Sequence, residues 1–276
     1  MKDLTKILKI GILVDNLKQK NLNGEIISTI LNNEKVKIDT VIINQRTKQK
    51  NKFVFLLKKY SIKRIVEKLL FKILTKIEKV IFALFFKKFD FQKTNLDEHS
   101  IEKIYVNPIE TELGLKDEYS KEDIKKIRDR NLDAILRLEG GILKGEILKA
   151  SKNGVLSFHH GDNDLYRGLP PGFWEVFYRK PTTGFIVQKL NEKLDGGDVI
   201  FKGQIPTKFF YYYNQQFIYK QSSKYINNVF EKILVKENPI YLKKKESGNK
   251  IFKDPNFLEL IKYIVSTYSF IFLKIL

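Results

Sequence analysis

The chain has 276 residues, with 51 Lys and Arg against 32 Asp and Glu, and therefore a formal net charge of +19. Its residues are 43% apolar and 13% aromatic, which is enough to bury a core and excludes a disordered tail or a fibrous repeat. The absence of cysteine excludes a disulfide scaffold, a thiolate metal site and a cysteine nucleophile.

The first residues, 1–6, lead into a short apolar stretch that Lys9 interrupts. A long apolar h-region and a small-residue cleavage site are both missing, so we expect an unexported, cytoplasmic protein. Residues 7–14 read as a buried strand, 24–33 as a short helix and 36–43 as a second strand, which is the start of a parallel α/β sheet. The loop Asp15–Lys18 has no glycine-rich phosphate fingerprint, so a dinucleotide cofactor is poorly supported.

A basic segment follows at residues 50–93, where thirteen basic residues face three acidic ones, a net charge of 13 − 3 = +10. Within it, residues 53–89 repeat apolar side chains at spacings of three and four with lysines between them, which predicts a long amphipathic helix or a helical hairpin. Only seven of the basic residues in the whole chain are arginine, and nucleic-acid surfaces favour arginine, so we expect no specific nucleic-acid partner.

The apolar stripe of residues 53–89 must be buried against something, because an exposed patch of that size is rare on a soluble monomer. The protein's own core, a second subunit of a homodimer and the headgroup region of an anionic membrane all remain open. Because lysines near an anionic surface add to the affinity of an amphipathic helix, we predict peripheral, salt-sensitive contact with the inner face of the membrane.

Beyond the basic segment the strand pattern resumes near residues 104–106 and continues at 134–138, 154–159, 183–190 and 199–202. Helices are expected at 121–128, 144–150, 211–236 and 257–276. The longest uncharged run of the last helix has eleven residues, too few to span a bilayer. We therefore predict an α/β fold with a Rossmann-like, mostly parallel sheet over residues 1–206, a basic helical insertion at 50–93 and a helical C-terminal extension over 207–276.

Two polar clusters carry the candidate chemistry. The first is Ser157–Asp162 at the carboxyl end of a predicted strand, and the second surrounds Asp195. Ser157 and His159 point to one face of an extended strand while His160 points away. A histidine with a nearby carboxylate makes a general acid/base pair. The plainer alternative is a strand-end cap and a turn, and a third is a metal site made of His159, His160 and Asp162.

The run Gly154–Trp174 (GVLSFHHGDNDLYRGLPPGFW) resembles the signature of the folate-dependent formyltransferases, and the blocks Thr183–Gln188 and Leu194–Ile200 continue the resemblance. It covers residues 100–205 well and the first strand, helix and strand weakly. The resemblance implies transfer of a formyl group from 10-formyltetrahydrofolate to an amine, with no metal. It further implies that His159 and Asp195 are the catalytic pair and that Leu138, Glu139, Gly140, Gly141 and Ile142 border the folate.

At one position the chain departs from the family pattern: Ser157 stands where the family has the asparagine that donates to the oxyanion. His160, in place of the family's usual proline, could compensate for the shorter serine. We expect Arg167 to anchor its loop and Trp174 to lie in the core.

The acceptor that we favour is a small molecule, an amino sugar on a nucleotide or a lipid carrier. In the family, methionyl-tRNA enzymes have a β-rich C-terminal domain, whereas residues 208–276 of this chain look helical. Two alternatives stay open: a hydrolase that releases formate from the folate, and a catalytically silent folate- or sugar-binding scaffold protein.

Overall fold

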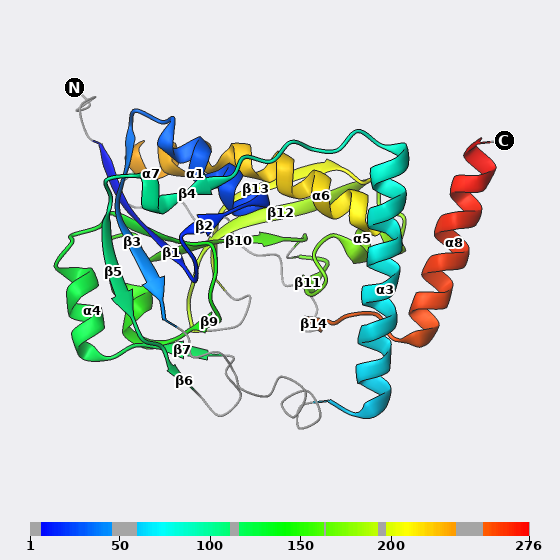
Figure 1. Cartoon of the computed structure of the whole chain (residues 1–276), viewed down its shortest axis with the longest axis horizontal. Helices are drawn as coiled ribbons and strands as arrows, with labels where there is room; N and C mark the ends of the chain where they lie inside the picture. The colour runs from blue at the N-terminus through cyan, green and yellow to red at the C-terminus, as the bar shows by residue number, and fades with distance from the viewer. Residues whose placement is uncertain are drawn as a thin grey trace.

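The computed structural model describes residues 7–45, 60–110, 116–162, 164–192, 197–235 and 251–275. Its centre is a seven-stranded sheet in the order β13-β12-β10-β8-β1-β3-β5 (Figure 1). The strands are β1 (Leu8–Val14), β3 (Val36–Asn44), β5 (Glu102–Val106), β8 (Ala134–Arg137), β10 (Val155–His160), β12 (Thr182–Lys189) and β13 (Asp198–Pro206). From β5 to β10 neighbouring strands run parallel, and β12 and β13 are added antiparallel. The predicted Rossmann-like, mostly parallel sheet is therefore confirmed.

Helices cover both faces of the sheet: α1 (Asn21–Leu31), α6 (Tyr211–Ser222) and α7 (Ile226–Val235) on one, α4 (Lys121–Arg128) and the 3₁₀ helix η2 (Gly145–Lys149) on the other (Figure 1). Successive residues of a strand point to opposite faces, so Ile12 of β1 packs with Ile27 and Phe230, whereas Leu13 packs with Ile127. The expected boundary after residue 206 falls between β13 and α6, and α7 completes the core of the sheet.

The basic segment contains one long helix, α3 (Ile62–Phe85), so residues 62–85 are not a hairpin. The hydroxyl of Ser61 accepts a hydrogen bond from the Arg64 backbone N–H at 3.3 Å and caps its first turn. Phe71 and Leu74 on one side of α3 are buried with Phe173 and Tyr211 in a cluster that joins α3 to α5 (Phe173–Phe177), α6 and α8 (Phe257–Ile275). Part of the apolar stripe is therefore buried in the protein's own core.

A buried carboxyl group fastens the same helices together. Glu78 of α3 accepts hydrogen bonds from the Tyr263 hydroxyl of α8 at 2.5 Å and from the Tyr212 backbone N–H of α6 at 2.7 Å. Burial raises the pKa of Glu78 to about 7, although these hydrogen bonds lower it. Within the described residues, no helix is both long and apolar enough to cross a membrane.

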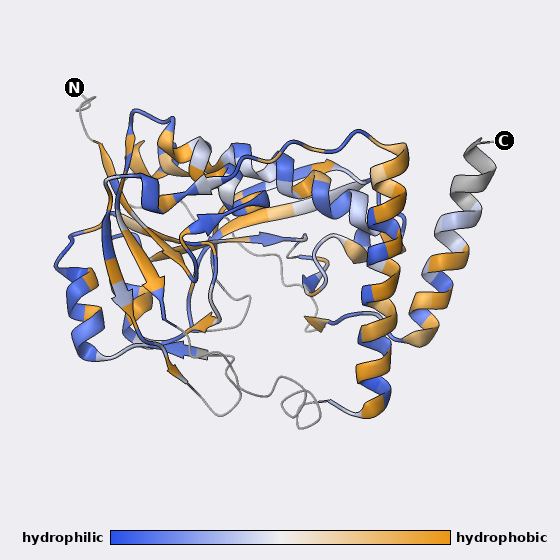
Figure 2. Ribbon diagram, in the orientation of Figure 1, coloured by the Kyte–Doolittle hydropathy of each residue, from blue (hydrophilic) through white to orange (hydrophobic). Residues whose placement is uncertain are grey.

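Short elements complete the fold and bring distant parts of the chain to the edge of the sheet. The pair β11–β14 places residues 251–252, just before α8, beside the loop that follows β10. The short elements of the fold are β2 (Lys18–Gln19), β4 (Thr94–Asn95), η1 (Leu96–Glu98), β6 (Ile109–Glu110), β7 (Lys116–Glu118), β9 (Ile142–Leu143), β11 (Arg167–Gly168), η3 (Ser223–Tyr225) and β14 (Ile251–Phe252). Figure 2 shows the apolar strands at the centre of the molecule and more hydrophilic residues towards its outside.

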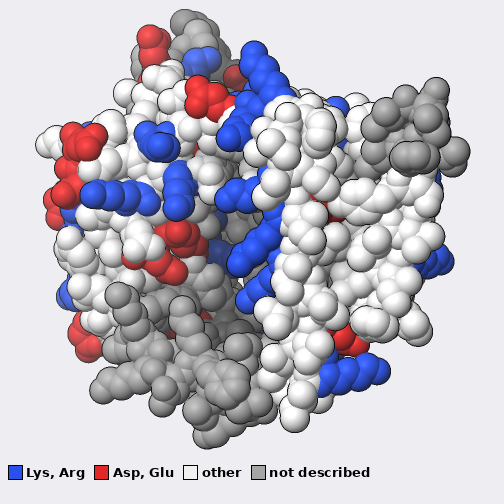
Figure 3. Space-filling model, turned by 45° about the vertical axis from the view of Figure 1, so that its right-hand side comes forward, with Lys and Arg blue, Asp and Glu red and all other residues white. Residues whose placement is uncertain are grey.

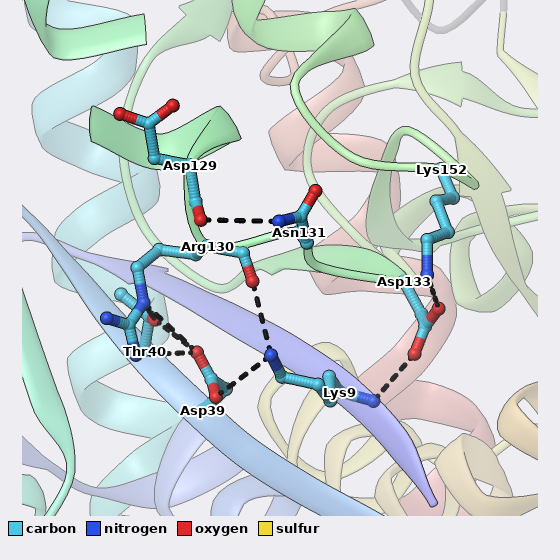
Figure 4. A network of polar contacts seen from close by, with 8 residues as sticks. All are labelled: Lys9, Asp39, Thr40, Asp129, Arg130, Asn131, Asp133 and Lys152. Carbon is cyan, nitrogen blue, oxygen red and sulfur yellow. Dashed lines mark hydrogen bonds and ion pairs between the residues drawn. The ribbon is translucent and has the colours of Figure 1, made fainter. Parts of the chain in front are cut away.

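At the amino ends of β1 and β8, charged side chains neutralise one another (Figure 4). Asp133 accepts from the Lys9 backbone N–H at 2.9 Å and pairs with Lys152 at 2.8 Å. Asp39 accepts from two nitrogens of Arg130, at 3.2 and 3.1 Å. Burial alone would raise the pKa of Asp39, but hydrogen bonds from Thr40 and Arg130 outweigh it and the pKa is lowered.

Candidate active site

A cavity of about 600 Å³ opens at the carboxyl ends of β8 and β10. In open α/β sheets this is the edge at which ligands bind. Its walls come from four parts of the chain: the strands β8, β9, β10 and β12, the amino end of α3, the β11–β14 pair and the residues directly before α8. Segments more than a hundred residues apart therefore meet at this cavity.

Ser157 and His159 both line the cavity from β10, as the alternation of the strand predicts. In the sheet, Ser157 lies between Arg137 of β8 and Gln188 of β12, which are its partners in register. Ser157 is buried and lines the cavity, and its hydroxyl donates to the Phe158 carbonyl oxygen at 3.3 Å. The structure thus brings a hydroxyl, an imidazole and a carboxamide to one wall.

The sequence analysis did not assign a role to Gln188. It is 3% exposed, lines the cavity, and its Oε1 has no hydrogen-bond partner in the part of the chain that the structure describes. A buried amide oxygen without a partner costs stability unless a ligand donates a hydrogen bond to it, which marks Gln188 as a candidate ligand contact. The available signal was a glutamine directly after the apolar run Phe185–Val187. Its position beside Ser157 depends on the antiparallel register of β12.

Asp195 lies outside the described residues, so its pairing with His159 stays a prediction. The described residues beside it show a close approach. A Cβ atom added to Gly197 would lie 2.3 Å from the Lys189 carbonyl oxygen and 2.9 Å from Gln188 Oε1. Residue 197 must therefore be glycine for β13 to begin this close to the cavity wall.

His160 points to the face of the sheet opposite Ser157 and His159, as the alternation of the strand predicts. It is buried against α6, where its Nε2 lies 2.9 Å from the Ser222 hydroxyl oxygen, and its ring packs on Phe158 and Tyr219. Burial lowers its pKa to about 3, with a smaller contribution from His159, so the ring is neutral. The idea that His160 compensates for Ser157 was wrong, because consecutive strand residues point to opposite faces.

The geometry also argues against a metal site made of His159, His160 and Asp162. The two histidine side chains point to opposite faces of β10, and Asp162 has other partners. Asp162 pairs with Lys202 at 2.9 Å, and its backbone N–H donates to Glu175 Oε1 at 3.3 Å. Among the described residues, no group of three or more His, Asp or Glu side chains is placed to hold a metal ion. Burial raises the pKa of Glu175 to about 7, and this carboxyl group supports the loop after β10.

Of the five residues predicted to border the folate, the structure places Ile142 on the cavity wall. Glu139 instead accepts hydrogen bonds from the backbone N–H groups of Asp15 at 2.8 Å and Asn16 at 3.2 Å, which fixes the loop after β1. The Gly141 N–H donates to Asp117 at 2.7 Å, and Gly140 has a φ of +106°, a conformation that favours glycine. Leu138 is partly buried against the core. A folate contact for these five residues remains a prediction.

The mouth of the cavity is positively charged. Arg64 and Lys68 of α3, Arg137 of β8 and Lys253 line it. Arg64 pairs with Glu67 at 2.8 Å, and Lys68 pairs with Asp254, the one carboxylate among the described lining residues. Such a surface favours an anionic ligand.

The structure also shows the positions of Trp174 and Arg167, which were expected to lie in the core and to anchor a loop. Trp174 is 4% exposed and donates from Nε1 to the Leu169 carbonyl at 3.1 Å, so it lies in the core as expected. Arg167 starts β11, whose pairing with β14 builds the loop beside the cavity. Neither residue lines the cavity.

Comparison with known proteins begins with the sequence. No protein-family model matches the chain. The methionyl-tRNA formyltransferase of Clostridioides difficile (strain 630) is 36% identical over 86 residues, which cover 31% of this chain and 28% of that protein. The methionyl-tRNA formyltransferase of Clostridium botulinum (strain Alaska E43 / Type E3) is 30% identical over 102 residues, 37% of this chain and 32% of that protein. The matched part thus spans about a third of these relatives.

Solved structures share the fold over most of the chain. Glycinamide ribonucleotide transformylase 1 from Symbiobacterium toebii superimposes with a TM-score of 0.51 and 11% identity, covering 83% of this chain and 88% of that one. The N-formyltransferase from Helicobacter canadensis, solved with folinic acid and dTDP-3-aminofucose, gives 0.51 and 13%, covering 89% and 71%. A formyltetrahydrofolate deformylase from Pseudomonas syringae pv. tomato str. DC3000 gives 0.51 and 12%, covering 84% and 62%. At these identities the likeness concerns the fold alone.

Proposed function

Because this chain is related in sequence to the formyltransferase family and has the fold of its folate-dependent members, we propose that it transfers a formyl group from 10-formyltetrahydrofolate to an amine. The observation that carries the proposal is the wall formed by Ser157, His159 and Gln188 at the carboxyl edge of the sheet. The proposal combines this wall with Asp195, assigned by the resemblance.

The residues of the cavity suit the folate. Ile142 and Leu143 supply apolar surface for a flat ring, and the Oε1 atom of Gln188, which has no partner in the described chain, can accept a buried hydrogen bond. The cations at the mouth suit an anionic tail or phosphates. Bound there, the folate would supply the activated formyl group.

The chain's own residues would then manage charge and protons. As the amine nitrogen bonds to the formyl carbon, negative charge develops on the formyl oxygen. The carbonyl re-forms when the bond from that carbon to the folate nitrogen breaks. Ser157 and the Nε2 amide group of Gln188 donate hydrogen bonds to that oxygen, while Gln188 Oε1 accepts one from the bound ligand. His159, oriented by Asp195, takes the proton that the amine loses and returns one to the leaving nitrogen.

The acceptor that we favour is an amino sugar carried on a phosphate, in a nucleotide or a lipid-linked form. Support comes from the cations at the mouth of the cavity. A pyrophosphate linkage would share Arg64 and Lys68 with their carboxylate partners, Glu67 and Asp254, and would lie beside Lys253. A tRNA acceptor would show affinity that falls steeply with salt and selects the initiator. With lysine as the main source of charge, we expect weak, unselective tRNA binding.

The decisive experiment incubates the protein with 10-formyltetrahydrofolate and a panel of amines, and measures formylated amine and free formate separately by mass spectrometry. Formylated amino sugar supports the proposal. The deformylase that shares the fold motivates the hydrolase alternative, which predicts formate release without any acceptor. Folate binding without turnover on the panel would favour the silent binding protein that the substitution at Ser157 suggests.

A further inference from the structure

The side of α3 that faces away from the core is apolar and uncovered. Eight residues at spacings of one to four are 37% to 74% exposed: Ile62, Val66, Leu69, Leu70, Ile73, Ile77, Val80 and Leu84. With 3.6 residues per turn they share one side of the helix, distinct from the side of Phe71, Leu74 and Phe82, which is buried. We call these eight residues the apolar face of α3.

Helix α8 extends the same surface. Leu258, Ile261 and Val265 are 75%, 44% and 61% exposed, although Tyr263 on the other side of α8 is fully buried. The start of α8 lies against α3, where Val66, Leu70 and Leu258 border a shallow groove of about 460 Å³. Figure 1 shows the two helices side by side at the end of the molecule opposite α4. The uncovered apolar surface therefore spans two helices rather than one.

The exposed charges of α3 beside this surface are basic, and the first turn of α8 adds one acidic residue, Glu259. Lys63, Lys72, Lys76 and Lys79 of α3 are exposed, and Figure 3 shows basic side chains gathered along an uncharged column at this end of the molecule. The two acidic residues of Ile62–Phe85 are turned inward, since Glu67 is 6% exposed and Glu78 is fully buried. The outer surface of α3 thus presents lysines and apolar side chains without a carboxylate.

The exposed lysines and apolar side chains of α3 together discriminate between a second copy of the chain and a membrane as the partner of this surface. A second copy of the chain packed through the same face would bring two rows of lysines together with no carboxylate of α3 between them, which is repulsive. An anionic bilayer can bury the apolar face of α3 at the boundary between its headgroups and its acyl chains. Its negative headgroups attract the lysines.

We propose that the apolar face of α3 and the exposed side of α8 dock in the headgroup region of an anionic membrane, with α3 lying in the plane of the interface. Tyr60 and the side chains of Arg64 and Lys68, at the amino end of α3, line the cavity. Docking therefore sets the cavity beside the headgroups. This last step rests on the proposed function: it favours an amino sugar on a lipid carrier over one on a soluble nucleotide.

The test is co-sedimentation with phosphatidylcholine vesicles, with and without phosphatidylglycerol, at low and high salt. The native protein should pellet with the anionic vesicles and be released by salt. Replacing Lys72, Lys76 and Lys79 by Gln should weaken binding by about a hundredfold, at roughly fivefold for each lysine. Replacing Leu69, Ile73 and Val80 by Gln should weaken it by about tenfold or more.

Matched controls come from the far end of the molecule. Lys35, Lys121 and Lys125 are exposed, and their joint replacement by Gln removes the same charge away from α3. Ile109→Gln replaces an isoleucine that is 55% exposed outside this surface. Both controls should bind anionic vesicles nearly as the native protein does, and circular dichroism checks that every variant is folded.

Three results would overturn the docking surface. The first is failure to pellet with either kind of vesicle, and the second is equal loss of binding in the Lys72/Lys76/Lys79 variant and its control. The third is a concentration-dependent dimer, measured by analytical ultracentrifugation, that the Leu69/Ile73/Val80 variant abolishes in the absence of vesicle binding. The assay uses neither folate nor amine, so its failure is separable from failure of the formyl-transfer proposal.

Discussion

The two edges of the central sheet differ in how their polar groups are satisfied. At the amino edge, Asp133 and Asp39 each accept from a lysine or arginine and from neighbouring groups (Figure 4). At the carboxyl edge, Gln188 keeps a buried oxygen without a partner in the described chain, and it faces a cavity beside Ser157 and His159. Paired charges hold strands together, whereas unsatisfied groups beside a cavity are suited to a ligand. Substitutions at the two edges should therefore separate stability from activity.

The largest effect is expected at His159. Replacing His159 by Ala should lower kcat by about 10²- to 10⁴-fold, the usual contribution of a positioned proton shuttle, with little change in the melting temperature. His99, which does not line the cavity, provides the matched control: His99→Ala should leave kcat unchanged. A His159→Ala protein with native kcat would remove His159 from the mechanism.

Gln188 comes next. Gln188→Leu keeps the approximate volume but removes the donor, and kcat should fall by about 10²- to 10³-fold, as when an oxyanion donor is lost. Stability should stay level or rise, because the buried oxygen without a partner is also removed. A drop in the melting temperature with unchanged kcat would instead make Gln188 a structural residue.

The pH dependence of stability should carry opposite contributions from the two edges. Burial raises the pKa of Glu175, beside the carboxyl edge, to about 7, so its stabilising contribution is present below pH 4.5 and is lost as the pH rises through 7. The full contribution is about 3 kcal/mol, at 1.36 kcal/mol per pKa unit. Asp39 at the amino edge has a lowered pKa, so its contribution is present near neutrality and lost in acid.

Urea unfolding between pH 4 and pH 8 measures these contributions. Glu175→Gln keeps an acceptor for the Asp162 N–H and should flatten the decline in stability between pH 5 and pH 7. An unchanged pH profile would show that Glu175 does not take up a proton in the folded protein over this range.

At the amino edge, Asp133→Ala should lower the free energy of unfolding by about 1–3 kcal/mol, because the Lys9 N–H loses its carboxylate partner. At a temperature where the variant is folded, kcat should be native. Loss of activity in the folded variant would show that the two edges are coupled and would weaken the comparison.

The smallest effect concerns Ser157. Ser157→Asn restores the family's amide, and kcat should stay the same or rise by up to about tenfold. In a Gln188→Leu background the same change should recover part of the lost rate, since the two side chains face each other across β10 and β12. A collapse of kcat in Ser157→Asn alone would show that the hydroxyl has a role of its own.

Local patterns in the sequence predicted much of the fold. The alternation in residues 36–43 and the spacing of apolar residues in 62–85 predicted β3 and α3. The helix expected at 121–128 is α4, and Ser120 caps it by accepting from the Asp123 N–H at 3.1 Å. Strand periodicity also placed Ser157 and His159 on one wall.

What the sequence could not provide depends on long-range pairing. The antiparallel addition of β12 sets Gln188 opposite Ser157, and the packing of α3 brings Arg64 to the cavity from far along the chain. Likewise, the number of apolar residues in α3 did not reveal that one side is buried and another exposed, because that depends on where α6 and α8 pack. The same periodicity predicted that His160 points away from Ser157 and His159, so the compensating role considered for His160 was inconsistent with a strand that continues through it.

The most direct test of the account is formyl transfer itself, measured in one assay on the native protein and on His159→Ala. With 10-formyltetrahydrofolate and phosphate-linked amino sugars, the account predicts a formylated amine from the native protein and about 10²- to 10⁴-fold less from the variant. Formate release without acceptor, or the same yield of formylated amine from both proteins, would contradict it.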